Sequence, residues 1–97
     1  MLPNYDIMSD TTEETMTRFV TFITPGLKRF DLAINATNRF YGKKLITDLQ
    51  SGITAIIGPD DLEEEGYLAY TYKLNDEEAE ELQQFLYLVV GVVNFTD

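Results

Sequence analysis

The C-terminal quarter of the sequence predicts an amphipathic helix, and any fold of this chain has to provide a surface for its apolar side. Asn75 is a good N-cap, and Glu78, three residues later, completes a capping box. The acids of the first turn lie where the helix dipole favours negative charge. One apolar stripe follows at i, i+3 and i+4, formed by Ala79, Leu82, Phe85, Leu86, Val89, Val90 and Val93. We expect this stripe to lie on a β-sheet.

The sequence before this helix has the alternation and the β-branched and aromatic content of strands. In the clearest of them, Phe30, Leu32 and Ile34 alternate with polar or small residues, which predicts a strand that is buried on one side. Pro25-Gly26 and Ser51-Gly52 are turn signals, and the second suits a two-residue hairpin. We expect strands at residues 16–23, 29–36, 43–50, 53–58 and 67–74.

Between the last two of these strands, the acidic segment 58–66 predicts a single helical turn. Asp60 with Glu63 three residues later is a capping pattern, and Gly66 provides the stop. Such carboxylates also suit a hard cation or the acid and base of a hydrolase. The spacing lacks the ligand pattern of an EF-hand loop, so a solvated turn is the better interpretation. The residues concerned are Asp60, Asp61, Glu63, Glu64 and Glu65.

These elements predict an α+β fold: an antiparallel β-sheet of about five strands, meander-like, packed against one C-terminal α-helix. A small closed barrel of OB or SH3-like shape with the helix appended is the alternative. A chain of 97 residues holds one core. We therefore expect residues 1–14 to be an acidic N-terminal segment with room to flex, and residues 15–97 to be a single domain.

The chain contains no cysteine and no histidine. It therefore has no disulfide, no thiolate nucleophile, and no histidine for a catalytic triad or a zinc site. Nucleotide-binding glycine motifs are also missing, so we expect no cofactor, no metal and no enzymatic activity. The N-terminus lacks the basic and apolar regions of a signal peptide, and no apolar run reaches the roughly 18 residues of a membrane span. This predicts a cytoplasmic protein without a membrane partner.

The net charge of −10 is divided unevenly along the sequence. Residues 1–14 carry four acids and no base, residues 15–58 six bases and two acids, and residues 59–97 one base and eleven acids, giving −4, +4 and −10. The positive middle interleaves cations with aromatic rings, a composition that single-stranded nucleic-acid binding uses. The acidity of the whole chain opposes this function, and cations at strand ends also serve to discourage edge pairing. The candidate charged surface, for a protein partner or for nucleic acid, comprises Lys28, Arg29, Arg39, Tyr41, Lys43 and Lys44, flanked by Phe30 and Phe40.

The end of the C-terminal helix predicts self-association. Every residue from Phe85 to Val93 is apolar, aromatic or glycine, so the side of the helix that faces away from the sheet is apolar as well. Alternatively, Gly91 ends the helix and the residues after it form an extended tail whose edge can pair with another strand. Both routes lead to a homodimer, whereas internal packing of the same side chains would not. The candidate self-association residues are Tyr87, Leu88, Gly91, Val92 and Phe95.

Several segments together resemble a family of small, uncharacterised proteins of Gram-positive bacteria. They are TRFV, RFDLAI, RFYGKKLI, AIIGPDDLEEEGYL and NDEEAEELQQFL, and the likeness runs from about Thr17 to Leu86. The resemblance implies a cytoplasmic bacterial protein and brings no functional residues with it. After Leu86 the apolar YLVVGVVNF departs from the more polar helix end expected of the family.

The first functional hypothesis is therefore a non-enzymatic protein-interaction or regulatory module that acts as a homodimer. Single-stranded nucleic-acid binding through the basic and aromatic surface is the first alternative. A carboxylate-based, metal-dependent hydrolase built on the acidic turn is the second. The sequence does not identify a protein partner other than a second copy.

Overall fold

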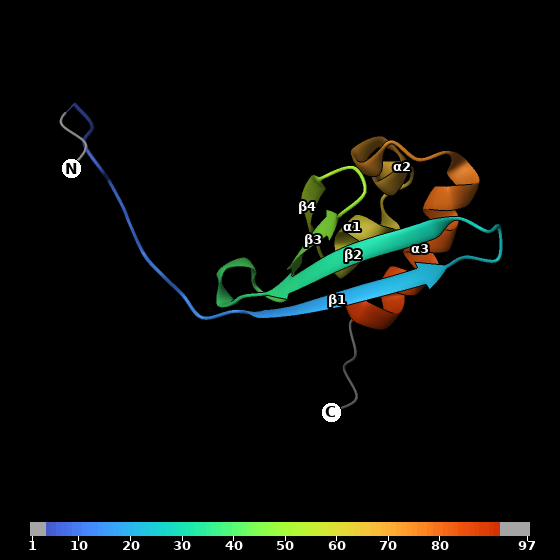
Figure 1. Ribbon diagram of the computed structural model, residues 1–97, viewed down its shortest axis with the longest axis horizontal. Helices are drawn as coiled ribbons and strands as arrows, with labels where there is room; N and C mark the ends of the chain where they lie inside the picture. Colours follow the sequence, from blue (N-terminus) through green and yellow to red (C-terminus); the bar gives the residue numbers. More distant parts are fainter. Residues whose placement is uncertain (1–3, 92–97) are drawn as a thin grey trace.

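The computed structural model describes residues 4–91, and it has an α+β architecture (Figure 1). Its four strands form one antiparallel sheet in the order β1-β2-β3-β4, which is the expected meander. The three helices follow the sheet in the sequence and pack on one of its faces (Figure 1). The elements are β1 (Met16–Ile23), β2 (Arg29–Ala36), the 3-10 turn η1 (Asn38–Phe40), β3 (Lys44–Asp48), β4 (Ile53–Ile57), α1 (Pro59–Glu63), α2 (Tyr67–Tyr72) and α3 (Asp76–Val89).

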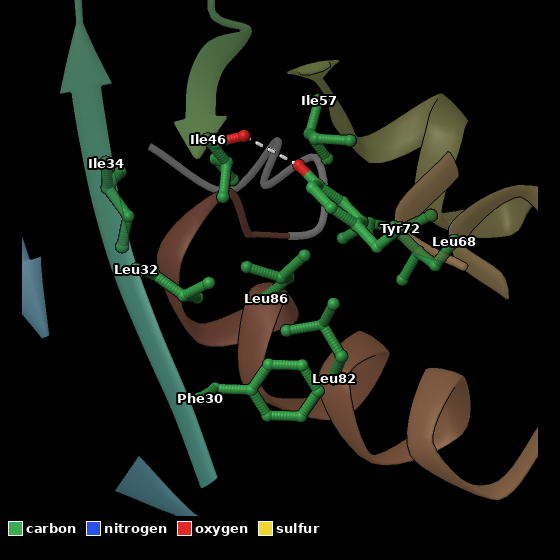
Figure 2. Close-up of a cluster of buried hydrophobic side chains, with 10 residues drawn as sticks. Phe30, Leu32, Ile34, Ile46, Ile57, Leu68, Tyr72, Leu82 and Leu86 are labelled. Carbon is green, nitrogen blue, oxygen red and sulfur yellow. Dashed lines mark hydrogen bonds between the residues drawn. The ribbon is translucent and has the colours of Figure 1, made fainter. Parts of the chain in front are cut away.

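The core lies between the sheet and the helices (Figure 2). From β2, the alternate residues Phe30, Leu32 and Ile34 are buried, as the sequence pattern predicts. From α3, Leu82 and Leu86 are buried against them. The rest of the core comes from the other strands and helices, with Ile46, Ile57, Leu62, Leu68 and Tyr72.

The predicted fifth strand at residues 67–74 is wrong, because this segment forms the helix α2. In a strand, Leu68, Tyr70 and Tyr72 would share a face, whereas in the helix Leu68 and Tyr72 are one turn apart and both buried, and Tyr70 is exposed. Left-handed residues, Gly66 and Lys73, bound the helix at its two ends. Aromatic content favoured a strand here, but packing against α3 decides the structure. Within residues 4–91 the sheet thus has four strands, it is open rather than a closed barrel, and three helices rather than one cover it.

The β3–β4 hairpin is correct in position but longer than the predicted two-residue turn. The strands end at Asp48 and resume at Ile53, so four residues form the loop. The Asp48 side chain accepts a hydrogen bond from the N–H of Gln50 at 3.0 Å, and the Asp48 carbonyl accepts one from Gly52 at 2.7 Å. These two bonds hold the wider loop closed.

Both predicted helix starts are present, with one shift. The Asn75 side chain accepts the N–H of Glu78 at 2.8 Å, and the Glu78 carboxylate accepts the N–H of Asn75 at 3.1 Å, which confirms the capping box of α3. The single turn α1, however, has Gly58 as its N-cap rather than Asp60. Asp61 is the residue that accepts the Gly58 N–H, at 2.8 Å, because Pro59 sets the first helical position two residues earlier than predicted.

The core also contains one buried polar link that holds α2 onto the sheet. The Tyr72 hydroxyl donates to the Ile46 carbonyl at 2.7 Å (Figure 2). Burial raises the pKa of this hydroxyl far above its ordinary value, so it stays a donor at all physiological pH values.

We predict that Tyr72→Phe lowers the free energy of unfolding by about 1 kcal/mol, because the substitution removes a buried hydrogen bond between α2 and the sheet. Urea unfolding measures this change. Tyr70→Phe is the matched control, because this tyrosine is exposed. The free energy of unfolding of this variant should stay within about 0.5 kcal/mol of that of the parent protein. Equal values for the two variants would contradict the assignment.

Candidate functional site

The strand β1 forms one edge of the sheet, and most of it is exposed. Phe19 is 73% exposed and Ile23 is 65% exposed, although both are large and apolar. Of its residues, Val20 and Phe22 are partly buried and pack against the core. In the part of the chain that the structure describes, no strand pairs with the outer side of β1.

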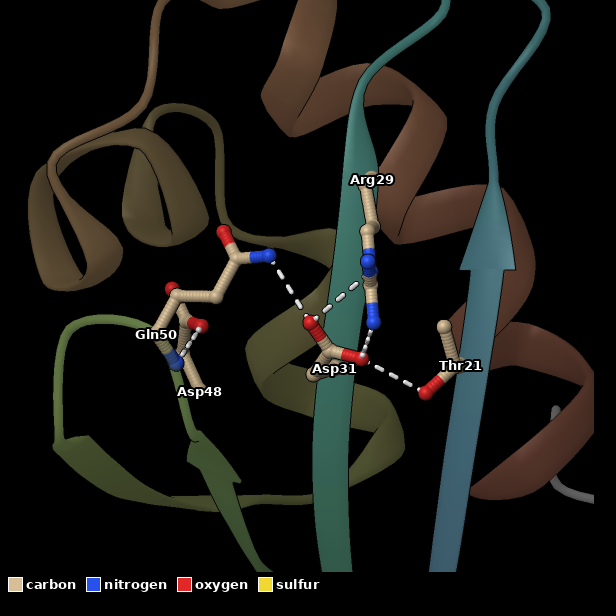
Figure 3. Close-up of polar contacts among 5 residues, drawn as sticks. All are labelled: Thr21, Arg29, Asp31, Asp48 and Gln50. Carbon is tan, nitrogen blue, oxygen red and sulfur yellow. Dashed lines mark hydrogen bonds and ion pairs between the residues drawn. The ribbon is translucent and has the colours of Figure 1, made fainter.

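The face of the sheet opposite the helices carries a polar network centred on Asp31 (Figure 3). The Asp31 carboxylate accepts hydrogen bonds from the Thr21 hydroxyl at 2.6 Å and from the Gln50 amide at 2.8 Å, and it pairs with Arg29 at 3.2 Å. These donors, first of all Thr21, lower the pKa of Asp31. Thr47 and Thr54 are hydrogen-bonded on the same face at 2.7 Å. The polar side chains at the centre of this face therefore have hydrogen-bond partners within their own chain.

The candidate self-association residues on α3 have different surroundings. Leu88 is 82% exposed. Tyr87 is partly buried against the core, and its hydroxyl donates to the Glu63 carboxylate, which raises the pKa of the tyrosine. Gly91 has a φ of +82°, so the helix gives way there to a left-handed residue, as the second route predicts. Val92 and Phe95 lie outside the described residues.

A groove of about 410 Å³ lies between the β1–β2 hairpin and α3, and Leu88 is one of the residues that line it. Its floor contains Phe85, whose ring stacks on that of Phe22 with centroids 4.0 Å apart. Glu81, also in the groove, accepts the N–H of Gly26 at 2.8 Å. The other carboxylate oxygen of Glu81 is buried and has no hydrogen-bond partner among the described residues. The remaining lining residues are Ile23, Thr24, Pro25 and Gln84.

The candidate charged surface is divided between the two ends of β2. Lys28 and Arg29 lie at one end, where Lys28 stands over the Phe30 ring at 5.5 Å and Arg29 pairs with Asp31. At the other end, Arg39 pairs with Glu13 at 2.6 Å. The structure therefore does not bring the six residues into one patch.

The remaining members of that set surround the start of β3. Lys43 pairs with Asp61 at 3.2 Å and with Asp60 at 3.3 Å, and these carboxylates raise its pKa. Lys44 is the first residue of β3 and is partly buried, whereas Tyr41 is almost fully exposed. Phe30 is buried in the core, so its ring is not available for base stacking.

The acidic turn lines a second groove, of about 500 Å³, between α1, α2 and α3. Its carboxylates come from Glu63, Glu64, Glu65, Asp76 and Glu80. Among residues 4–91, no three acidic side chains converge in the way that a metal ion requires. Within the same range, no helix has the length and apolar character to cross a membrane.

The unpaired edge of β1 is a feature that the sequence reasoning missed. Its sequence carries little sign of an edge strand, since β1 contains Arg18 as its single charged residue and has no proline. Natural edge strands are commonly protected by charges, prolines or bulges. The sequence of this segment is compatible with an edge strand and with an interior strand. Only the order of strands in the sheet identifies it as an edge.

Comparison with known proteins places the chain in a family but supplies no activity. A family model described as SAV0927-like matches residues 8–88, which include the whole sheet and α3 as far as Leu88. The match confirms the resemblance inferred from Thr17 to Leu86 and extends it toward the N-terminus. No curated protein matches the chain.

We predict that Asp31→Asn lowers stability at neutral pH and that this difference disappears in acid. Because the folded pKa of Asp31 lies below its ordinary value of 3.8, the stability due to its ionised form is present above that value and is lost as the pH falls through the folded pKa. Urea unfolding of both proteins between about pH 6 and pH 2 measures the difference. Asp10→Asn, in the exposed leading segment, is the control and should differ little from the parent throughout. A pH-independent difference for Asp31→Asn would contradict the role of its charge.

Proposed function

The chain belongs to the SAV0927-like family, and we propose that it acts in the cytoplasm as a non-enzymatic protein-interaction or regulatory module that works as a homodimer. One observation carries this proposal: large apolar side chains are exposed along the edge strand β1 and in the groove between β1 and α3. Ile23 and Leu88 line the same groove, and Phe19 follows on the same face of β1 as Ile23.

These side chains are gathered at one edge of the sheet, which distinguishes them from ordinary exposed apolar side chains. Single exposed leucines are common on soluble proteins, whereas contiguous apolar patches mark contact surfaces. Covering one such side chain fully contributes about 1.5–3 kcal/mol, so three of them in each copy contribute about 9–18 kcal/mol against an association cost of about 4–15 kcal/mol.

The distribution of charge favours a second copy as the occupant. A chain with a net charge of −10 repels its own copies over most of its surface. The segment 16–25 contains no acid, and Arg18 is its only charged residue. Two copies therefore meet with the least repulsion where their β1 strands approach each other.

The two alternative functions have weaker support. For nucleic acid, Arg29, Arg39 and Lys43 are all paired with carboxylates of the same chain, so phosphate would have to compete with these acids. For a hydrolase, the carboxylates of the acidic groove lie on exposed helical turns, and no pair of them is set in a desolvated cleft.

We predict that light scattering at micromolar concentration gives twice the 11.1 kDa mass of one chain, and that Leu88→Asp raises the dissociation constant at least about tenfold. The substitution would bury a carboxylate in an apolar contact. Circular dichroism should be unchanged, because Leu88 is exposed in the single chain.

Leu49→Asp is the matched control, since Leu49 is also an exposed leucine but lies in the β3–β4 loop, far from β1 in the order of strands. It should leave the mass unchanged. A monomeric parent protein, or equal effects of the two substitutions, would refute the proposed dimer surface.

A further inference from the structure

Starting from the proposed homodimer, we propose that the two copies join through their β1 strands, which pair antiparallel about a two-fold axis at Val20. The two four-stranded sheets then form one continuous sheet of eight strands. Each copy also places Arg18 in the groove of the other, beside Glu81. This proposal names the contact and its register, which the proposed function leaves open.

The hydrogen bonds of the hairpin show which backbone groups of β1 are free. The Thr24 N–H donates to the Lys28 carbonyl at 2.9 Å, and on the other side of β2 the Asp31 carbonyl accepts the Leu49 N–H at 2.8 Å. Bonding alternates along an antiparallel pair, so the even-numbered residues of β1 bond to β2. The odd-numbered ones direct their N–H and C=O groups away from the sheet. These residues are Thr17, Phe19, Thr21 and Ile23.

In one symmetric register, all four of these residues form backbone hydrogen bonds with the second copy. With the axis at Val20, Thr17 lies opposite Ile23 of the second copy, and Phe19 lies opposite Thr21. An axis at Thr21 would place Thr17 opposite Pro25, which has no N–H to donate. An axis at Phe19 would place Ile23 opposite a residue that precedes the strand. The Val20 register is therefore the one in which every free N–H and C=O group along the edge of β1 has a hydrogen-bond partner.

The same register complements charge on the face that carries the helices. Arg18 is exposed and no carboxylate of the described residues pairs with it. In the Val20 register Arg18 lies opposite Phe22 of the second copy, which lines the groove that contains Glu81. A guanidinium stacks on aromatic rings and pairs with carboxylates, and one oxygen of Glu81 is buried with no donor from residues 4–91. An axis at Arg18 itself would instead bring two like charges together.

The side chains on the opposite face are also consistent with pairing. Phe19 and Ile23 are exposed there in the single chain. In the Val20 register each faces a threonine of the second copy, and the two Phe19 rings become diagonal neighbours across the new strand pair. Apolar side chains that have no cover in one copy thus gain it at the junction.

Disulfide trapping of single-cysteine variants tests the register directly, because the chain has no cysteine of its own. Val20 would face its own counterpart at a position without direct hydrogen bonds, with Cα atoms about 4.5 Å apart, which is within disulfide range. We expect Val20→Cys to give a covalent dimer on mild oxidation. Met16→Cys is the control on the same face, since its counterparts would lie roughly 26 Å apart along the strands, and it should stay monomeric on a non-reducing gel.

A mixture of two variants provides a second test at exposed positions, in case Val20→Cys disturbs the core. Thr17→Cys and Ile23→Cys should cross-link when mixed and not when oxidised separately. Dimers in light scattering without these cross-links would overturn the strand pairing and leave the proposed homodimer standing. Monomers at all concentrations would overturn both.

A charge reversal tests the contact between Arg18 and the groove. We predict that Arg18→Glu raises the dissociation constant at least about tenfold, because it places a carboxylate beside Glu81. Lys73→Glu gives the same net charge at an exposed position after α2, and it should change the constant much less. Equal effects would show that only net charge matters and would overturn the proposed contact.

Discussion

The structure depends on the packing of one helix across a sheet that is wider than the helix. Leu82 and Leu86 of α3 lie over the buried residues of β2 (Figure 2). A helix is about 10 Å across, and strands are spaced about 4.8 Å apart, so α3 covers two to three strands at most. The short helices α1 and α2 complete the cover on the side of β3 and β4, where Leu62, Leu68 and Tyr72 are buried. No comparable element covers the outer side of β1 within residues 4–91.

Local signals in the sequence predicted much of this fold. The capping box of α3 and the alternation in β2 are short-range patterns, and both are confirmed. The error at α2 has a different origin, since six residues rich in tyrosine suit a strand and a helix about equally, and contact with α3 selects the helix. That error also concealed the correct number of strands, although it did not change the order of the first four.

The candidate site was predictable only in part. Leu88 is exposed as expected of a helix side that faces away from the sheet, whereas Tyr87 is partly covered by its own chain through Glu63. The groove and the edge of β1 require residues from both ends of the sequence, such as Phe22 and Phe85. Periodicity within a segment carries no information about such contacts. Nor does closeness in the sequence show that side chains are close in space, and the cations of the middle segment are in fact dispersed over the fold.

The hydrogen bond between Gly26 and Glu81 joins residues that are 55 positions apart in the chain. A Cβ at position 26 would lie 3.0 Å from the Glu81 carboxylate, so any other residue there would have to push this carboxylate back. The bond fastens the far end of β1 to the middle of the helix that holds the core. The edge strand β1 is therefore joined to the core in two ways: along its length through β2, and beyond its end through the hairpin tip that is bonded to α3.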